Sequence, residues 1–380
     1  MSGHLVHGMG TGLEDPAWPR ITLAEARAVL AHYPDAGAPL ALEWHSPRPF
    51  SAACLARTTT ATLFLKRHAA ALRSPAVLAS EHAFIAHLAA AGLPVARVLA
   101  TASGASALSL GGATWEVHQQ APGADLYRDR QSWTPYLTPA HAYAAGQMLA
   151  RLHRAAQGFA APARHAAPLV ASSTILAAPD PMAAARAYVA ARPALADYLG
   201  ARDWQGALAA RLAHHGAGAL APQLAALPPL WTHNDWHPSN LLWDGAGAVA
   251  SVLDFGLSDR CFALYDLATA LERCAVRWLE LGSTDDAALV EAEAARALLA
   301  GYSAICPLGV GERALLAGLL PLVHIEFALA EVDYFHGLLG RPQDAALAWE
   351  GFALGHADWF ARPAGQALLA LIAHTAGDAG

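Results

Sequence analysis

A change in hydrophobic periodicity near residue 120 constrains the fold of this chain more than any other sequence feature. Before this point, a helix is predicted over 22–33 behind the cap residue Thr22, and another runs from Ser74–Pro75 to Ala91. After it, nearly every segment has helical spacing, apart from a strand–loop–strand block over 231–253. Strands are predicted over 39–44, 50–57, 60–67, 95–100, 107–110 and 114–119. This order predicts an α+β fold with two lobes, a small β-rich one followed by a larger helical one.

The join between the two predicted lobes falls at Gln119–Gly123, where a Pro-Gly pair breaks both periodicities. We therefore predict a flexible, polar N-terminus over 1–20, an N-terminal lobe over 21–119 and a helical C-terminal lobe over 120–380. Ligands commonly bind in clefts at joins of this kind. The sequence thus predicts a binding cleft between the lobes.

Composition excludes several classes of protein. Of the 380 residues, 55% are hydrophobic and 14% charged, which favours a large core over disorder. The net charge of −7, without a concentrated basic segment, argues against a nucleic-acid partner. Apolar runs are interrupted before the ~18 residues that a membrane span needs, and no secretory signal is evident. Four scattered cysteines are typical of buried thiols, so we expect a cytoplasmic protein.

Lys66 is the only lysine among 24 basic residues. Wherever this chain needs a solvated positive charge, it uses arginine. A position that keeps lysine is therefore a candidate for a slim, flexible ammonium group rather than a planar guanidinium. Lys66 lies within the strand predicted over 60–67.

The segment from 231 to 256 carries most of the chemical information. Asp235 lies five positions before Asn240, and a glycine turn over 245–247 then leads along an apolar strand to Asp254. A hairpin of this kind brings Asn240 and Asp254 to the same end, where both offer oxygen atoms to a hard cation. Mg²⁺ suits two such ligands together with phosphate oxygens and water.

This segment resembles the catalytic and metal-binding loops of the protein-kinase-like superfamily. The pattern His-x-Asp-x-x-x-x-Asn followed by Asp-Phe-Gly is most similar to the aminoglycoside phosphotransferase and choline kinase branch, and it stands here as His233–Asn240 and Asp254–Gly256. The resemblance extends from about Pro39 to Glu272. It implies a small N-terminal lobe over a helical C-terminal lobe, with ATP and Mg²⁺ bound between them.

The resemblance also implies roles for residues of the helical lobe. Asp235 corresponds to the catalytic aspartate that orients the acceptor hydroxyl and accepts its proton. Asn240 and Asp254 correspond to the two magnesium ligands, and His233 orients the catalytic loop. Asp266 resembles the structural aspartate that braces this loop.

In the N-terminal lobe, the resemblance implies a nucleotide site. Lys66 corresponds to the lysine that holds the α- and β-phosphates, and Glu81 on the following helix to its ion-pair partner. The hinge would present backbone groups to adenine from Gln119, Gln120 and Ala121. The lone-lysine argument and the resemblance reach Lys66 independently. Glu81 is equally compatible with a solvated charge on its helix.

The sequence departs from the superfamily pattern in three ways. The stretch 46–57 has no glycine-rich loop, so Ser51, with Ser46, is the candidate for contacting phosphate. Asn234 stands between His233 and Asp235, where protein kinases have arginine. The short distance from Asp254 to Asp266 leaves no room for an activation segment. The last two departures argue against a protein substrate.

The acidic residues of a predicted C-terminal helix over 323–338 allow two interpretations. We favour a solvated acidic stripe, interrupting the apolar surface at His324, Glu326, Glu331 and Asp333. In the other interpretation Glu326 and Asp333 line the acceptor pocket, where carboxylates would suit an amine-bearing alcohol. Asp125 and Asp129, just after the hinge, are weaker candidates for the same role.

Three hypotheses about function follow. The leading one is an ATP- and Mg²⁺-dependent phosphotransferase acting on the hydroxyl group of a small metabolite: an amino alcohol, hydroxy amino acid, sugar or aminoglycoside. The second is a degenerate kinase-like module that binds nucleotide without turnover. The third is zinc-dependent hydrolysis through His233 and His237. It is disfavoured because Asn234 replaces the glutamate that acts as general base and Pro238 keeps His237 out of a helix.

Overall fold

The computed structural model describes residues 5–7 and 9–374, which divide into two units by their internal contacts. Unit 1 contains residues 1–124 and 250–253, and unit 2 contains 125–249 and 254–380. Residues 1–4 and 8 of the predicted flexible N-terminus lie outside the described residues. The rest of that segment includes a short antiparallel pair, β1 (Val6–His7) with β2 (Leu13–Glu14). The domain boundaries given above stay predictions.

Unit 1 is built on one antiparallel five-stranded sheet with the order β3-β4-β5-β7-β6. Its strands are β3 (Pro39–His45), β4 (Ala52–Thr58), β5 (Thr62–Ala69), β6 (Leu108–Leu110) and β7 (Ala113–Gln119). Five of the six predicted strands in this region are thereby confirmed. The prediction of a strand over 95–100 is wrong. Val95 bridges Val252 while Val98 bridges His118, so the segment changes partner and forms no continuous ladder.

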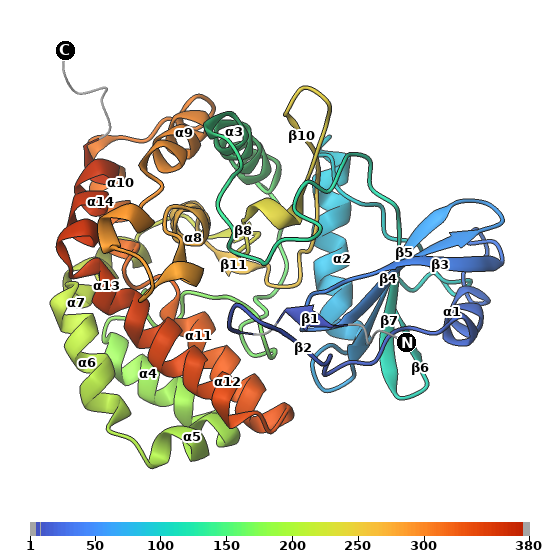
Figure 1. The fold of residues 1–380 in the computed structure, drawn as a ribbon, viewed down its shortest axis with the longest axis horizontal. Coiled ribbons are helices and arrows are strands. Elements are labelled where there is room, and N and C mark those ends of the chain that lie inside the picture. Colours follow the sequence, from blue (N-terminus) through green and yellow to red (C-terminus); the bar gives the residue numbers. More distant parts are fainter. Residues whose placement is uncertain (1–4, 8, 375–380) are drawn as a thin grey trace. The chain divides into compact units, whose positions relative to one another are not determined.

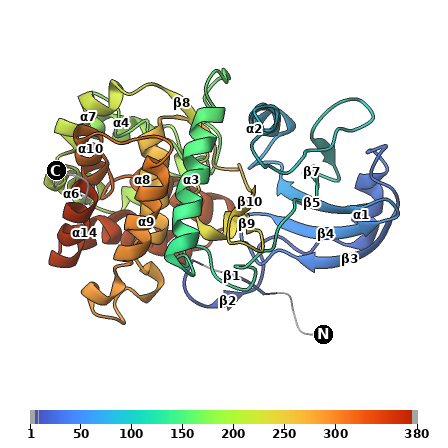
Figure 2. The same ribbon diagram turned by 90° about the horizontal axis from the view of Figure 1, so that it is seen from above.

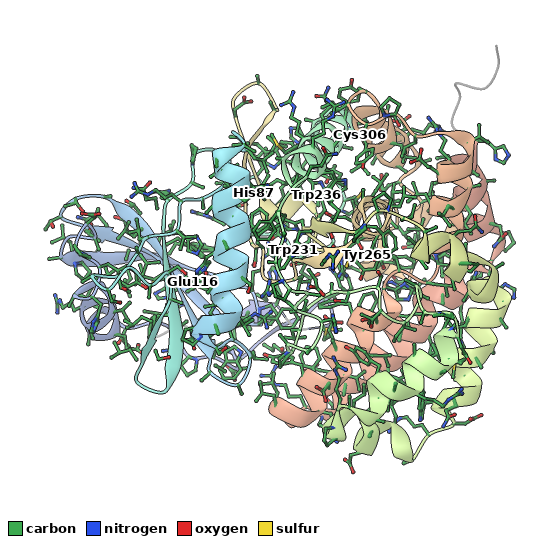
Figure 3. All side chains as sticks on the ribbon, turned by 180° about the vertical axis from the view of Figure 1, so that it is seen from behind. His87, Glu116, Trp231, Trp236, Tyr265 and Cys306 are labelled. Atoms are coloured by element: carbon green, nitrogen blue, oxygen red, sulfur yellow. The ribbon has the colours of Figure 1, made fainter. Side chains whose placement is uncertain are left out.

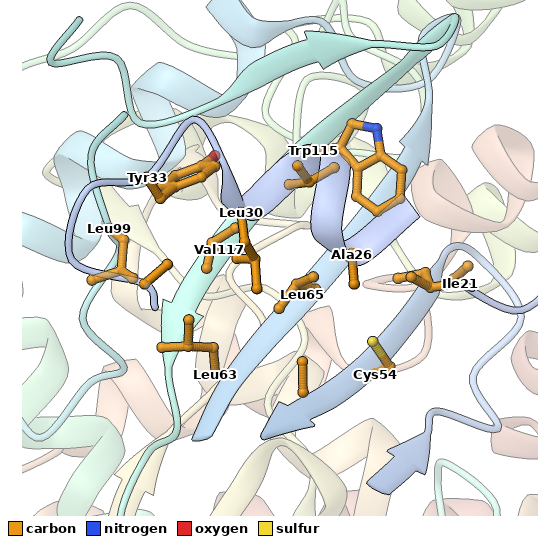
Figure 4. Packing of buried hydrophobic residues seen from close by; sticks show 14 residues of the cluster. Ile21, Ala26, Leu30, Tyr33, Cys54, Leu63, Leu65, Leu99, Trp115 and Val117 are labelled. Carbon is orange, nitrogen blue, oxygen red and sulfur yellow. The ribbon is translucent and has the colours of Figure 1, made fainter. Parts of the chain in front are cut away.

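One face of the sheet carries the apolar core of unit 1. Helix α1 (Leu23–Leu30) begins at the predicted cap Thr22, whose side chain accepts the Glu25 N–H within a capping box. Its buried face packs on alternate residues of β5 and β7, including Leu65 and Val117, as Figure 4 shows. Because strand side chains alternate in direction, the residues between these core positions face the other side of the sheet.

Helix α2 (Pro75–Ala90) covers that other face, and the layer beneath it is polar. The Ser74 hydroxyl caps the helix and Pro75 occupies its first turn, as predicted. From α2, His82 reaches the carboxylate of Glu116 on β7. Figure 3 places Glu116 between the sheet and this helix. The sheet therefore has one apolar face and one face of buried charges.

Unit 2 is mainly helical, with short strand pairs that carry its loops (Figures 1 and 2). The helices are α3 (Pro139–Ala155), α4 (Pro181–Ala190), α5 (Pro193–Gly200), α6 (Trp204–His214), α7 (Ala217–Ala225), α8 (Ala263–Cys274), α9 (Ala292–Ser303), α10 (Val310–Leu319), α11 (Ile325–Asp333), α12 (Pro342–Ala346), α13 (Ala357–Phe360) and α14 (Pro363–Ala373). π-helical turns follow α11 and α12 at Tyr334–Leu338 and Leu347–His356. Among the described helices, none combines the length and the apolar character that crossing a bilayer demands.

Helices α3 and α9 lie side by side in both views (Figures 1 and 2) and make the most extensive helix contact of unit 2. Glycines at the crossing allow this approach. A Cβ atom added to Gly146 of α3 would lie 2.1 Å from the carbonyl oxygen of Leu298, and one added to Gly301 of α9 would lie 2.0 Å from that of Tyr143. No side chain fits at either position without separating the helices.

Candidate functional site

The predicted catalytic loop is held by backbone hydrogen bonds to one buried carboxylate. The loop follows β8 (Leu230–Thr232) and ends in a short 3-10 helix over Pro238–Asn240. Near the start of α8, Asp266 accepts the backbone N–H groups of His233 and Asn234, both at 2.8 Å. The ring of His153 contacts the same carboxylate at 3.1 Å. Asp266 thus fixes the first half of the loop, and His153, which the sequence interpretation passed over, supports it.

Asn234 explains why this position is not arginine. Its backbone has φ of +63°, a left-handed conformation that asparagine tolerates better than most residues. Its side chain is fully buried, accepting the Thr232 hydroxyl at 2.6 Å and donating to the Ala171 carbonyl at 2.8 Å. A long charged side chain does not fit this role. The departure from the protein-kinase pattern therefore serves to anchor the loop.

Asp235 is the partly exposed carboxylate at the centre of this loop. Its side chain is 19% exposed, and His237 and Arg273 lie 3.5 Å and 3.8 Å from its two oxygens. Burial by itself would raise the pKa of Asp235, but the charge and hydrogen bond of His237 and the charge of Arg273 outweigh it and lower the pKa. The carboxylate is consequently ionised at neutral pH, as a proton acceptor must be.

Asn240 lies against Asp235 in a way that leaves one oxygen for a cation. Its Nδ2 atom donates to the backbone carbonyl of Asp235 at 2.9 Å and to Oδ2 at 3.1 Å. Within the described residues, its Oδ1 atom accepts no hydrogen bond. Asp254 stands at φ +53°, and its Oδ1 accepts the Gly256 N–H at 3.3 Å. An amide oxygen and a carboxylate form a donor set that fits Mg²⁺. Left-handed backbone at a non-glycine residue is typical of functional loops.

In unit 1, Lys66 lies on the polar face of the sheet. It is directly opposite Glu116 in the β5–β7 register and opposite Ala53 in the β4–β5 register. Residues opposite each other share a face, so Lys66 and Glu116 both face the side covered by α2. Glu81, on α2, is buried rather than solvated. Its pairing with Lys66 stays a prediction.

Two further segments of unit 1 were predicted to contact nucleotide. At the hinge, the N–H groups of Gln119 and Gln120 donate to the carbonyls of Arg97 and Thr62, at 2.9 Å and 3.2 Å. The N–H of Ala121 makes no hydrogen bond within the described residues, so it is the hinge donor left for a ligand. In the β3–β4 connection, Ser51 is half-buried. The roles of all these residues stay predictions.

A histidine cluster surrounds Glu116. This carboxylate contacts the Nε2 atoms of His68 at 2.8 Å, His82 at 2.7 Å and His118 at 2.9 Å. Burial alone would raise the pKa of Glu116, but the charge and hydrogen bonds of the histidines lower it far below its usual value. The sequence interpretation regarded these histidines as ordinary. The one sequence feature that could have indicated the cluster is Glu116, a charged residue between Trp115 and Val117 in a predicted strand.

Our favoured interpretation of the acidic C-terminal helix is wrong. On α11, Glu326 and Glu331 are buried, because the helix lies inside unit 2 and not on its surface. The Glu326 carboxylate accepts the Thr174 hydroxyl at 2.6 Å and the Ile175 N–H at 2.8 Å. Asp333 accepts the Leu195 N–H at 3.1 Å. A role for Glu326 and Asp333 in the acceptor pocket stays a prediction, as does one for Asp125, whose Oδ1 accepts the Tyr127 N–H at 3.1 Å.

A second buried group of charges lies next to Asp235 and was also passed over. Glu272 and Arg273 lie in the last turn of α8, and Glu272 contacts His356 at 2.7 Å. Glu272, His324 and His356 place their ligand atoms within 4.8 Å of one another, as do His82, Glu116 and His118 in unit 1. Neither of these clusters, the two found in the described part of the chain, includes His233 or His237.

Comparisons with known proteins show the family of this chain. The model of the phosphotransferase enzyme family (APH) matches residues 48–308. A homoserine kinase of Phenylobacterium zucineum (strain HLK1) is 30% identical over 269 residues, which cover 70% of each chain.

Solved structures of kinases share the fold. An amicoumacin kinase superposes with a TM-score of 0.58 at 15% identity, covering 88% of this chain and 92% of that one. A microcompartment-associated aminopropanol kinase gives 0.56 at 17% identity, covering 91% and 100%. An aminoglycoside phosphotransferase from Alicyclobacillus acidocaldarius gives 0.51 at 18%, covering 93% and 96%. The predicted α+β, protein-kinase-like fold is confirmed. The chain belongs to the phosphotransferase enzyme family and is a small-molecule kinase.

Proposed function

We propose that this protein transfers the γ-phosphoryl group of ATP, with Mg²⁺, to the hydroxyl group of a small metabolite. The observation that carries this proposal is the setting of Asp235: a partly exposed carboxylate in hydrogen-bond contact with Asn240, on a loop fixed by Asp266. Phosphoryl transfer requires mainly positioning and charge stabilisation, and this loop supplies a fixed proton acceptor next to a cation ligand.

Each residue has a separate task in this proposal. Asp235 orients the acceptor hydroxyl and takes its proton as the oxygen attacks phosphorus. Asn240 and Asp254 hold Mg²⁺, which neutralises charge on the phosphate oxygens when bound. Lys66 binds the α- and β-phosphates, and Ala121 offers its N–H to the base. Ser51 contacts phosphate in place of a glycine-rich loop.

The relatives support a nucleotide and a small alcohol as the two substrates. The amicoumacin kinase was solved with AMP-PNP, Ca²⁺ and its antibiotic. The homoserine kinase and the aminopropanol kinase are named for small amine-bearing alcohols. We therefore place amino alcohols and hydroxy amino acids ahead of sugars and aminoglycosides as acceptors.

The test is ADP release from ATP·Mg²⁺ across a panel of alcohols, with wild-type protein and Asp235→Asn. This change keeps the size of the side chain and removes the proton acceptor, so kcat should fall by about 10²–10⁴-fold. Asp286→Asn is the matched control, since Asp286 makes only a partly exposed ion pair with Arg362 at 3.2 Å. Full activity in Asp235→Asn would refute the assignment.

The same measurements separate turnover from the binding-module alternative, which the missing glycine loop motivates. A thermal-shift titration with ATP·Mg²⁺ reports binding, and the panel reports product. Stabilisation by nucleotide without product from any alcohol would favour the degenerate module over the kinase.

A further inference from the structure

Two buried ionisable side chains, Arg273 and Glu331, contact neither substrate in the transfer step described above. Arg273, on α8, is 2% exposed, and Glu331, on α11, is also 2% exposed. Burying a charge without hydrogen-bond partners costs several kcal/mol, so groups of this kind need an explanation. The inference below rests on the proposed function and concerns the acceptor that the site takes.

Arg273 is held in place by aromatic rings and has unused donors. Its guanidinium carbon lies 4.4 Å from the centre of the Trp133 ring, and the rings of Phe327 and Phe352 follow at 5.5 Å and 5.4 Å. Its Nε is 3.8 Å from Asp235, and its Nη1 is 3.8 Å from Glu272. These distances are too long for hydrogen bonds. Neither Nε nor Nη1 has a hydrogen-bond partner among the described residues.

Glu331 has an unused acceptor in the same region. Its Oε2 atom is buried and has no donor among the described residues. Burial raises the pKa of Glu331 to about 8; the charge of Arg273 opposes this rise, and the charges of Asp235 and Glu272 add to it. The other two buried glutamates nearby differ, because Glu326 and Glu272 each have short hydrogen bonds to partners. Glu331 is thus the carboxyl group in this region that lacks a donor.

We propose that the acceptor is a small hydroxy amino acid: Arg273 binds the carboxylate of the acceptor, and Glu331 binds the ammonium group of the acceptor. A planar guanidinium with free N–H groups matches a carboxylate. A buried glutamate with a free oxygen matches an ammonium, whose arrival also favours the ionised form of Glu331. Arg273 thereby acts on the substrate, while Asp235 receives the hydroxyl.

The distances limit the size of this acceptor. Because Arg273 Nε and Asp235 Oδ1 are only 3.8 Å apart, a ligand that reaches both has its carboxylate and hydroxyl separated by a short carbon chain. A zwitterion adds no net charge to this buried region and satisfies both unused groups at once.

The test compares three acceptors that differ by one charged group. L-homoserine has both groups, 3-amino-1-propanol lacks the carboxylate, and 4-hydroxybutanoate lacks the ammonium. With wild-type protein, kcat/KM for L-homoserine should exceed that for either analogue by at least about 100-fold, since a buried polar group left unpaired strongly penalises the analogue. Equal kcat/KM for all three would overturn the proposal.

Variants then assign each preference to one residue. In Arg273→Met, the preference for L-homoserine over 3-amino-1-propanol should fall about tenfold or more, while its preference over 4-hydroxybutanoate persists. In Glu331→Gln, the preference for L-homoserine over 4-hydroxybutanoate should fall about tenfold or more, while its preference over 3-amino-1-propanol persists. Arg211→Met is the matched control, because Arg211 pairs with Asp358 elsewhere in unit 2. Arg273→Lys keeps the charge and replaces the methionine variant if that variant does not fold.

Three outcomes would overturn this proposal, and they differ in what they say about the kinase assignment. If Arg273→Met lowers kcat for all three acceptors by the same factor, Arg273 only positions Asp235 and the proposal is overturned. If the wild-type protein phosphorylates other alcohols but none of these three, the kinase assignment stands and the acceptor assignment falls. If no alcohol yields product, both fall.

Discussion

At the scale of single residues, a substitution at Lys66 tests whether this position requires lysine rather than arginine. Lys66 stands opposite Glu116 on its strand, and an arginine at this position would replace a compact ammonium by a larger, planar guanidinium. We expect Lys66→Arg to lower kcat/KM for ATP by about 100-fold although the charge is kept, because displaced phosphates lose their alignment. Steady-state kinetics at varied ATP checks this expectation.

The control for that substitution is the reverse exchange at a surface position. Arg57 on β4 forms an exposed ion pair with Glu43 at 2.6 Å, so Arg57→Lys should leave kcat/KM unchanged. If Lys66→Arg behaves like Arg57→Lys, the chain kept lysine at position 66 by chance.

The sequence pointed to residues at this scale only where a motif carries them. Asp235 and Asn240, both named from the motif, lie in hydrogen-bond contact, and Asp266 accepts hydrogen bonds from the loop backbone. Glu331 was wrongly interpreted as a solvated charge, and Arg273 was not considered, because no local pattern distinguishes a buried charge from a solvated one. Their burial depends on helices far apart in the sequence, and α11 was judged by its charges alone.

At the scale of elements, the glycines of the α3–α9 crossing predict a large effect from a single methyl group. In Gly301→Ala the new Cβ meets a backbone oxygen that cannot move without moving α3. We expect a loss of about 3 kcal/mol in the free energy of unfolding, measured by urea denaturation.

Gly311 provides the matched control for this prediction. It lies in α10, where an added Cβ has no atom within 4 Å. Gly311→Ala should leave stability unchanged or raise it by up to about 1 kcal/mol, because alanine is the better helix former. Equal effects at both glycines would contradict the close packing of α3 against α9.

Helices and strands were predictable where their ends carry caps and their cores keep a period. Thr22 and Ser74 each cap the helix predicted behind them. The segment 95–100 was mistaken for a strand because it is a short, mostly apolar run with two β-branched valines, although its partners change along its length. Pairing between distant strands is information that a local period does not contain.

At the scale of the whole molecule, buried histidines make stability depend on pH. Burial lowers the pKa of His324 from 6.5 to about 3, while Glu272 raises it and His356 and Arg273 add to the lowering. Below pH 6.5 the unfolded chain therefore takes up a proton that the folded chain refuses, and stability falls as pH falls. From pH 6.5 to 5 this group alone removes about 2 kcal/mol.

The raised pKa of Glu331 acts in the opposite direction, with stability lost as pH rises from 4.5 towards 8. A comparison of variants isolates His324 from it. On going from pH 6.5 to 5, the free energy of unfolding of the wild type minus that of His324→Gln should decrease by about 2 kcal/mol. His214→Gln, at an exposed position, should show no such change between the two pH values. A constant difference for His324→Gln would contradict the buried neutral imidazole.

The membership of residues 250–253 in unit 1 has a consequence for biosynthesis. Within that unit, Val252 donates to the Pro94 carbonyl at 2.8 Å and the Ser251 hydroxyl donates to that of Pro122 at 2.7 Å. The ribosome must therefore translate about half of unit 2 before the first unit has all its parts. A fragment truncated after residue 124 lacks residues 250–253 of unit 1. Unit 1 therefore cannot complete its folding before unit 2 is partly synthesised.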